Sequence, residues 1–406
     1  MSSRTIAEPR ASMFPGRFNP ADTLDVPNKP EARDTRSTIK ATCAFREERT
    51  PMDLDIPQGW DEVAPEWATS ALQGAFPGVE VSSVDVALVD DGTNRRARLA
   101  LSYANGSGPA TVFVKASDPE HAAVNARTGG VFNEPRLFAS EVPLPVDHPA
   151  VYFTLIDEPH LDFIMVMEDI VARGCDPRDA TRPMTVAQVE NGVRSLARLH
   201  SVFWGDRLRR YPQLSWVEPF VSWRGMAIGI DIGLERAGDR VPPEVQRLTG
   251  KAIMRDVWAP FVGTLASGAQ TLLHGDPHIG NTYVTPDDGV GFLDWQVVRR
   301  GNPSVDLGYF LQGACTIEDR RDAERDLVED YCAALELPAD ERPSTDEMWL
   351  RYRASTAHGL TMWLVTAASD WQRPEVSLAL AERYAAAFVD LDAATAIEEL
   401  VSRTRT

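Results

Sequence analysis

The chain has 406 residues, of which 43% are hydrophobic and 25% are charged, a composition typical of globular proteins. A formal net charge of −19 disfavours binding to nucleic acid or to anionic membranes, because both need a basic surface. No apolar run is long enough to span a membrane, and four scattered cysteines without metal-ligand spacing predict reduced thiols in a cytoplasmic protein.

The beginning of the chain differs in composition from the rest. Residues 1–55 are rich in proline, arginine, serine and threonine, contain few large apolar residues and show no periodicity. This composition predicts a disordered leader, with Met52 as an alternative first residue. From Trp60 onward the pattern becomes globular, and a short helix is expected to end at Phe76–Gly78.

Alternating apolar residues and turn signals predict a five-stranded antiparallel sheet after that helix. Turns rich in glycine and asparagine separate the first three strands, which therefore form a meander. Two further strands complete the sheet. The expected strands are Val81–Val89, Ala97–Tyr103, Ala110–Lys115, Val151–Leu155 and Phe163–Met167.

Two charged residues in this half of the chain have a kinase-like order. Lys115 ends the third strand, and Glu134 lies on a helix expected at Phe132–Ser140. In kinases a strand lysine reaches the α- and β-phosphates and pairs with a helix glutamate. Two solvated surface charges are the alternative, but their position before the motif at residues 274–294 favours the functional interpretation.

Two short segments are candidates for contact with a nucleotide. The turn at residues 91–94 would offer backbone N–H groups to phosphates, although its single glycine makes this a weak signal. The fifth strand runs directly into two acidic residues, and its end could serve as a hinge and meet the edge of an adenine. The candidate nucleotide contacts are Gly92, Thr93, Asn94, Met167, Glu168 and Ile170.

The most informative stretch is residues 271–296. His274-Gly275-Asp276 is followed five positions later by Asn281, and Asp294 comes at the end of an apolar run. A kinase needs a carboxylate near the attacking hydroxyl, and an asparagine and a second aspartate to hold Mg²⁺ against the phosphates. The spacing therefore predicts Asp276 as the base and Asn281 and Asp294 as metal ligands.

The 271–296 stretch has two other interpretations, a transition-metal site and a purely structural loop. His274, Asp276 and His278 alternate, so on a strand they would share one face and could ligate a transition metal. Pro277 argues against a regular strand there, and a metal site of this kind would leave Asn281 unexplained. A purely structural hydrogen-bonding role for the loop is the third alternative.

The second half of the chain is expected to be mostly helical. Thr185 and Gln188 form a capping box, and His200 lies on an apolar stripe, where a satisfied core histidine is expected. Asn302 and Pro303 are expected as the N-cap and first residue of a helix. Asp306, near its start, is a candidate acceptor for hydrogen bonds from the 271–296 stretch. Ser344 and Glu347 form a second expected capping box.

Several segments carry a resemblance to a known family: Val112–Lys115, Met165–Ile170, Leu196–Gly205, His274–Asn281, Leu293–Gln296 and Asn302–Leu311. On these residues the chain resembles the aminoglycoside phosphotransferase and choline kinase superfamily, and within it the ecdysteroid-kinase-like (CHK-type) group. The resemblance extends from about Trp60 to Val401. It implies an α+β, protein-kinase-like fold of two lobes, with a small β-rich N-lobe at 56–167 and a large helical C-lobe at 168–406.

The resemblance also implies cofactors and residue roles. ATP and Mg²⁺ are the implied cofactors, and a small-molecule alcohol is the implied partner. The implied roles are catalytic base for Asp276, magnesium ligands for Asn281 and Asp294, phosphate anchor for Lys115 with Glu134, and adenine hinge for Met167–Ile170. Trp295-Gln296 stands where protein kinases have Phe-Gly, so no activation switch of their kind is expected.

The expected function is ATP- and Mg²⁺-dependent phosphorylation of a hydroxyl on a small molecule. One alternative is an antibiotic phosphotransferase for a cationic aminosugar, which the acidic net charge favours. The tryptophans of the helical half, among them Trp349, Trp363 and Trp371, instead favour a bulkier apolar alcohol. A non-catalytic pseudokinase is the other alternative, and the complete set of five motif residues disfavours it.

Overall fold

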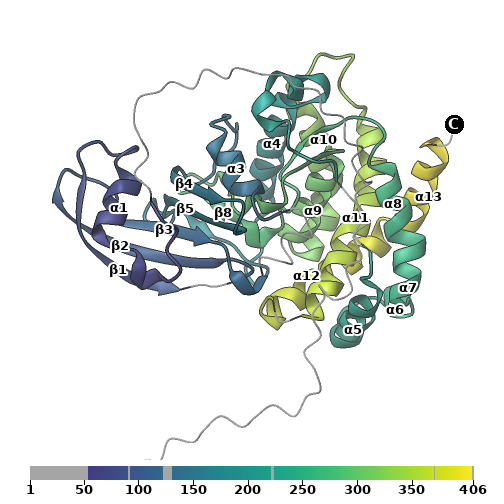
Figure 1. Cartoon of the computed structure of the whole chain (residues 1–406). Coiled ribbons are helices and arrows are strands. Elements are labelled where there is room, and N and C mark those ends of the chain that lie inside the picture. Colours follow the sequence, from purple (N-terminus) through teal and green to yellow (C-terminus); the bar gives the residue numbers. More distant parts are fainter. Residues whose placement is uncertain (1–53, 90–91, 122–129, 221–223, 370, 405–406) are drawn as a thin grey trace, which may run out of the picture.

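The computed structural model describes residues 54–89, 92–121, 130–220, 224–369 and 371–404. The expected leader lies outside the described residues, apart from its last two positions, and so does Asp91 of the expected phosphate-binding turn. Figure 1 shows a small β-rich lobe followed by a larger helical lobe, so the expected two-lobed α+β architecture is confirmed. We propose the lobe boundary at residues 167–168, where the fifth strand ends.

The small lobe is built on the expected five-stranded sheet. All neighbouring strands are antiparallel, in the order β1-β2-β3-β5-β4. The observed ends of the strands differ from the expected ends by no more than two residues. Their bounds are β1 Glu80–Val89, β2 Arg95–Asn105, β3 Thr111–Ala116, β4 Val151–Asp157 and β5 Asp162–Glu168.

Helices cover both faces of this sheet. The alternation of side chains along β5 sends Ile164 and Val166 to the face that packs against α1 (Pro65–Leu72). Phe163, Met165 and Met167 point to the opposite face, where they form a second cluster with Phe138 of α3 (Asn133–Ala139). Because β5 is apolar on both faces, it forms the buried centre of the lobe.

Short strands hold the 271–296 stretch in the large lobe. β7 (Thr271–Leu273) pairs with β10 (Arg299–Gly301), and this pairing brings the two ends of the stretch together. β8 (Thr282–Val284) pairs with both β9 (Val290–Phe292) and β6 (Asp176–Pro177). Two 3₁₀ turns, Ile279–Asn281 and Trp295–Val297, connect these strands.

Helices make up the rest of the large lobe. α11 packs against α5, α9 and α12, and every residue of α9 is buried, as expected for a helix in the centre of a lobe. The remaining bounds are α4 Val186–Val202, α5 Ala227–Ala237, α6 Pro243–Gln246, α7 Gly250–Ala252, α8 Ala259–Thr264, α9 Ser304–Ala314, α10 Ile317–Ala334, α11 Thr345–Ala367, α12 Pro374–Asp390 and α13 Ala393–Thr404. A π-helical segment, Ile253–Trp258, joins α7 to α8, and short 3₁₀ turns occupy Trp60–Glu62, Gly205–Arg210, Pro212–Leu214 and Gly238–Arg240.

No helix in the described ranges has the length and apolar character needed to cross a bilayer.

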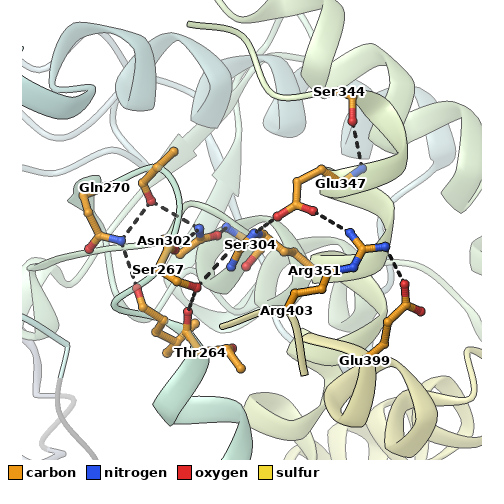
Figure 2. Close-up of polar contacts among 12 residues, drawn as sticks. Thr264, Ser267, Gln270, Asn302, Ser304, Ser344, Glu347, Arg351, Glu399 and Arg403 are labelled. Carbon is orange, nitrogen blue, oxygen red and sulfur yellow. Dashed lines mark hydrogen bonds and ion pairs between the residues drawn. The ribbon is translucent and has the colours of Figure 1, made fainter. Parts of the chain in front are cut away.

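The expected helix caps are largely present. The Thr185–Gln188 capping box is confirmed in full. Ser344 caps α11 by accepting a hydrogen bond from the Glu347 N–H, but the Glu347 carboxylate pairs with Arg351 and Arg403, as Figure 2 shows. The second expected box therefore forms only from the serine side, because the two arginines engage its glutamate.

The expected start of α9 is wrong by one residue. The helix begins at Ser304 with Pro303 as its N-cap. Pro303 already has helical torsions, and a difference of one residue is common when the ends of helices are assigned. The Asn302 side chain still accepts a hydrogen bond from the Ser304 N–H, at 3.1 Å. Its amide nitrogen donates to the carbonyl groups of Ser267 and Ala269, so the turn before α9 is tied to the segment that follows α8 (Figure 2).

Candidate active site

The position of Asp276 depends on a sharp turn directly after β7. Gly275 has a φ of +88°, and a Cβ atom there would lie 2.0 Å from the Val297 carbonyl oxygen. An alanine would therefore meet both an unfavourable torsion and a clash with backbone. The glycine lets the chain pass close to the 3₁₀ turn Trp295–Val297 and directs Asp276 into a cavity.

Asp306 of α9 accepts hydrogen bonds from the same turn. Its two carboxylate oxygens accept the N–H groups of His274, at 2.7 Å, and Gly275, at 3.0 Å. His200 Nε2 lies 3.2 Å from the same carboxylate, and His200 Nδ1 lies 2.7 Å from the Tyr331 hydroxyl. The expected role of Asp306 as an acceptor is confirmed, and His200 is the satisfied core histidine that was expected.

Asn281 and Asp294 lie beside Asp276, as the motif predicts. The Asn281 amide nitrogen donates to the Asp276 carbonyl oxygen, at 2.9 Å, and to its carboxylate, at 3.0 Å. The Leu293 N–H donates to the Asn281 carbonyl at 2.8 Å, which joins the two segments just before Asp294. Asp294 has a left-handed φ of +60°, a conformation that aspartate tolerates better than most residues.

Lys115 connects the small lobe to this group. Its ammonium lies 2.5 Å from a Glu134 carboxylate oxygen and 2.8 Å from Asp294 Oδ1. Glu134 also accepts the Trp295 N–H at 3.2 Å, so α3 is tied to the residue after Asp294. Burial alone would lower the pKa of Lys115, but the charges of Asp294 and Glu134 raise it above its ordinary value.

The two aspartates have opposite electrostatic environments. Burial and then the charge of Asp294 raise the pKa of Asp276 well above the usual carboxyl range, although a quarter of its side chain is exposed. Burial would also raise the pKa of Asp294, but the neighbouring Lys115 ammonium outweighs it and the pKa is lowered. Asp294 is therefore the stable anion of the pair, and Asp276 is the stronger base.

The two histidines of the loop serve its hydrogen bonding. His274 Nε2 donates to the Leu293 carbonyl at 2.9 Å, and its Nδ1 accepts the Asp276 N–H at 3.2 Å. His278 Nδ1 accepts the Gly280 N–H at 3.0 Å, and burial lowers the pKa of His278 to about 3. Because both nitrogens of His274 are engaged, the transition-metal interpretation of this stretch does not fit. In the described parts of the chain no three His, Cys, Asp or Glu side chains are grouped to hold a metal.

The candidate nucleotide contacts fall into two groups. Gly92 and Thr93 lie at the cavity, whereas the Asn94 side chain is buried and donates to Gln296 Oε1 at 2.9 Å. The backbone oxygen of Gln296 accepts a hydrogen bond from Asn133 at 2.9 Å. Gln296 thus joins the β1–β2 turn, α3 and the stretch that contains Asp294, a role that the sequence alone did not reveal.

The expected hinge residues lie at the end of β5, apart from the large cavity. Met167 and Ile170 are buried, and the Ala150 N–H donates to a Glu168 carboxylate oxygen at 3.3 Å. Asp169 is paired with Arg98 of β2 at 2.8 Å and accepts a hydrogen bond from Thr111 of β3 at 2.8 Å. Its carboxylate therefore braces the sheet beside the hinge.

A cavity of about 1060 Å³ opens beside the loop. Its walls come from the loop, from the second half of α11 and from the beginning of α12. Trp363 and Trp371 line it, whereas Trp349 stacks on Tyr352 away from it. Sequence reasoning missed most of its other residues, because they have no motif of their own: Arg96, Met226, Arg236, Arg299, Tyr309, His358, Met362, Thr366, Arg373, Ser377 and Leu378.

Residues 132–348 match the family described as the phosphotransferase enzyme family (APH). The chain belongs to this family. The matched range covers more than half of the chain and includes α3, the hinge and the whole 271–296 stretch. Membership of the aminoglycoside phosphotransferase and choline kinase superfamily is thus confirmed, whereas the ecdysteroid-kinase-like subgroup stays a prediction.

Solved structures resemble this family member at low sequence identity. An aminoglycoside-3′-phosphotransferase of type VIII is 20% identical with a TM-score of 0.38, and the match covers 72% of this chain and 98% of that one. Choline kinase LicA from Streptococcus pneumoniae is 12% identical with a TM-score of 0.44 over 80% and 98% of the two chains. An ethanolamine kinase from Plasmodium vivax is 11% identical with a TM-score of 0.45 over 74% and 80%. A search of the curated proteins found no match.

Proposed function

We propose that this phosphotransferase uses Mg²⁺ and ATP to phosphorylate a hydroxyl group of a small molecule. The observation that supports this most strongly is that Lys115 of the small lobe pairs with Asp294, which lines the same cavity as Asp276. The pairing of Lys115 with Glu134 and of Asn281 with Asp276 completes the set. A complete set of this kind favours catalysis over nucleotide binding alone.

The donor atoms near Asp294 fit Mg²⁺. Asn281 uses its amide nitrogen to bind Asp276, so its amide oxygen can serve as a ligand, and Asp294 adds a carboxylate with a lowered pKa. Oxygen atoms of these types are the ligands that Mg²⁺ prefers. When bound, the ion would neutralise phosphate charge. Lys115 would bind phosphate oxygens through its ammonium, while Glu134 keeps that ammonium in position.

Asp276 would act on the acceptor. Its raised pKa suits a group that takes the proton from the attacking hydroxyl, and Asn281 holds its carboxylate by a hydrogen bond. The acceptor oxygen forms a bond to the γ-phosphorus, the bond from that phosphorus to the β–γ bridging oxygen breaks, and ADP leaves. Positioning and charge stabilisation supply most of the rate enhancement, because phosphoryl transfer needs little covalent chemistry from the protein.

The test is to incubate the full chain with ATP and a broad panel of alcohols and to detect phosphorylated products by mass spectrometry. One set of reactions contains Mg²⁺, and a matched set contains a metal chelator. We expect an acceptor-dependent product that requires both ATP and Mg²⁺. Tight binding of Mg²⁺-ATP without any product from the panel would favour the pseudokinase alternative, and equal product with chelator would contradict the role of the metal.

A further inference from the structure

His358 of α11 is buried without a polar partner. About 1% of its surface is exposed, and neither ring nitrogen has a hydrogen-bond partner among the residues that the structure describes. Aromatic rings surround it, with centroid distances of 4.4 Å to Tyr309, 5.5 Å to Phe220 and 5.8 Å to Trp258. Buried polar side chains almost always have a hydrogen-bond partner, which makes His358 a candidate for contact with a ligand.

The same histidine lines the cavity that contains Asp276. Tyr309 connects the two residues, because it lines the cavity beside Asp276 and its ring makes an edge contact with His358. The three residues therefore belong to one continuous wall. Burial lowers the pKa of His358 to about 4, so at neutral pH the ring carries one hydrogen-bond donor and one acceptor.

The charges around the cavity restrict the ligands that it would bind. Among the described lining residues, the acidic ones are Asp276 and Asp294, and both belong to the catalytic set. No further described carboxylate lines the cavity to pair with a cationic acceptor, although the whole chain carries a net charge of −19. The lining contains four arginines and several apolar side chains: Arg96, Arg236, Arg299, Arg373, Met226, Met362, Trp363 and Leu378.

We propose that the acceptor is an uncharged alcohol with two oxygen functions, of which one faces Asp276 and the other hydrogen-bonds to His358. This inference rests on the proposed function for the reacting hydroxyl. The His358 subsite itself requires only binding. A neutral imidazole can donate to a carbonyl or ether oxygen and can exchange hydrogen bonds with a hydroxyl. The apolar and aromatic side chains would contact the body of the ligand and exclude water from both ends.

The test measures binding to the full chain, without ATP, by calorimetry. The probes are a rigid bicyclohexyl diol and the cyclohexylcyclohexanol that lacks one hydroxyl, together with choline and glucosamine as cationic alcohols. We expect the diol to bind more tightly than the mono-alcohol and than either cation. His358→Phe should remove the preference for the diol, with a loss of about 5- to 150-fold in diol affinity, because a buried ligand hydroxyl then lacks its partner.

Two further variants distinguish a polar contact from a change in packing. His358→Asn keeps one donor and one acceptor and should retain part of the preference for the diol. Thr361→Val is the matched control, because Thr361 is on the same helix, is buried and has an unpartnered hydroxyl, but does not line the cavity. This control should bind the probes as the parent does. Melting temperatures would verify that each variant is folded.

Several results would overturn the inference. The first two are equal affinity of the parent for the diol and the mono-alcohol, and tighter binding of choline or glucosamine than of the diol. The other two are an unchanged preference for the diol in a folded His358→Phe protein, and no binding of any uncharged probe to the parent. Phosphoryl transfer is measured separately. Binding of the diol through His358 without transfer from ATP would contradict the proposed function and leave the subsite in place.

Discussion

Asp276 is a partly exposed carboxylate with an unusually high affinity for a proton. Burial and the charge of Asp294 raise its pKa, and we propose that Lys115 and the metal ligands, rather than Asp276, contact the phosphates. Replacement by asparagine keeps the shape and removes the proton acceptor. The residue should therefore matter for the chemical step more than for nucleotide binding.

We predict that Asp276→Asn lowers kcat by about 10²–10⁴-fold, the usual value of general-base assistance, and changes ATP affinity by no more than a few-fold. The measurements are a phosphorylation assay and a calorimetric titration with Mg²⁺-ATP. Asp287→Asn is a suitable control, because Asp287 is exposed in the turn between β8 and β9. Lost ATP affinity with retained kcat would assign Asp276 to the nucleotide instead.

The lowered pKa of His358 leads to a prediction about how the stability of the protein depends on pH. Its pKa is about 4 in the folded protein and 6.5 in an unfolded chain, so between these values only the unfolded state binds the proton. The free energy of unfolding should fall as the pH falls from 6.5 to 4, by about 3 kcal/mol from this residue alone. His358→Phe should remove that part of the fall. Denaturant unfolding of parent and variant at pH 7 and pH 4.5 would measure it, and parallel losses in both proteins would contradict the prediction.

At the scale of elements, the catalytic loop is held by α9. Asp306 lies in the first turn of this buried helix and accepts the two N–H groups that precede Asp276. Asn302 fixes the segment before α9, because its side-chain nitrogen donates hydrogen bonds to the carbonyl groups of Ser267 and Ala269 (Figure 2). The loop is thus positioned by a helix whose own start is anchored to the segment between α8 and β7.

We predict that Asp306→Asn disturbs this support. An asparagine presents one oxygen and one NH₂ group, so one of the two loop N–H groups loses its acceptor and faces a donor. The expected loss is about 1–3 kcal/mol in the free energy of unfolding, with a reduced kcat. Asp256→Asn, at a surface ion pair with Arg255, is the control and should leave stability unchanged. Equal stability of parent and Asp306→Asn in denaturant titrations would show that the loop needs no such acceptor.

At the scale of the whole molecule, the sequence predicted the elements that have local signals. Alternation around Ala97, Leu99 and Leu101 located β2, because the buried face of a strand repeats every second residue. The spacing of Asp276, Asn281 and Asp294 predicted that these residues lie together, because they belong to one continuous stretch. Capping by Thr185 was predictable for the same reason, since the cap and its partner are three residues apart.

Features that depend on distant parts of the chain were not predictable. The side chain of Asn94 donates to Gln296, which is 202 residues away in the sequence and gives no local signal. His358 carries no motif, and its importance follows from the packing of α11 beside Tyr309 and the cavity. Glu347 was expected in a capping box, but Arg403 of α13 competes for its carboxylate.

The central claim is that this chain is a Mg²⁺-dependent phosphotransferase in which Asp294 holds the metal. Its most direct test is the transfer of a labelled γ-phosphoryl group from ATP to an alcohol, measured at fixed Mg²⁺ in the parent and in Asp294→Ala. The account predicts that the variant stays folded, as judged by its melting curve, and that transfer falls below detection. Unchanged turnover in a folded Asp294→Ala protein would contradict the account.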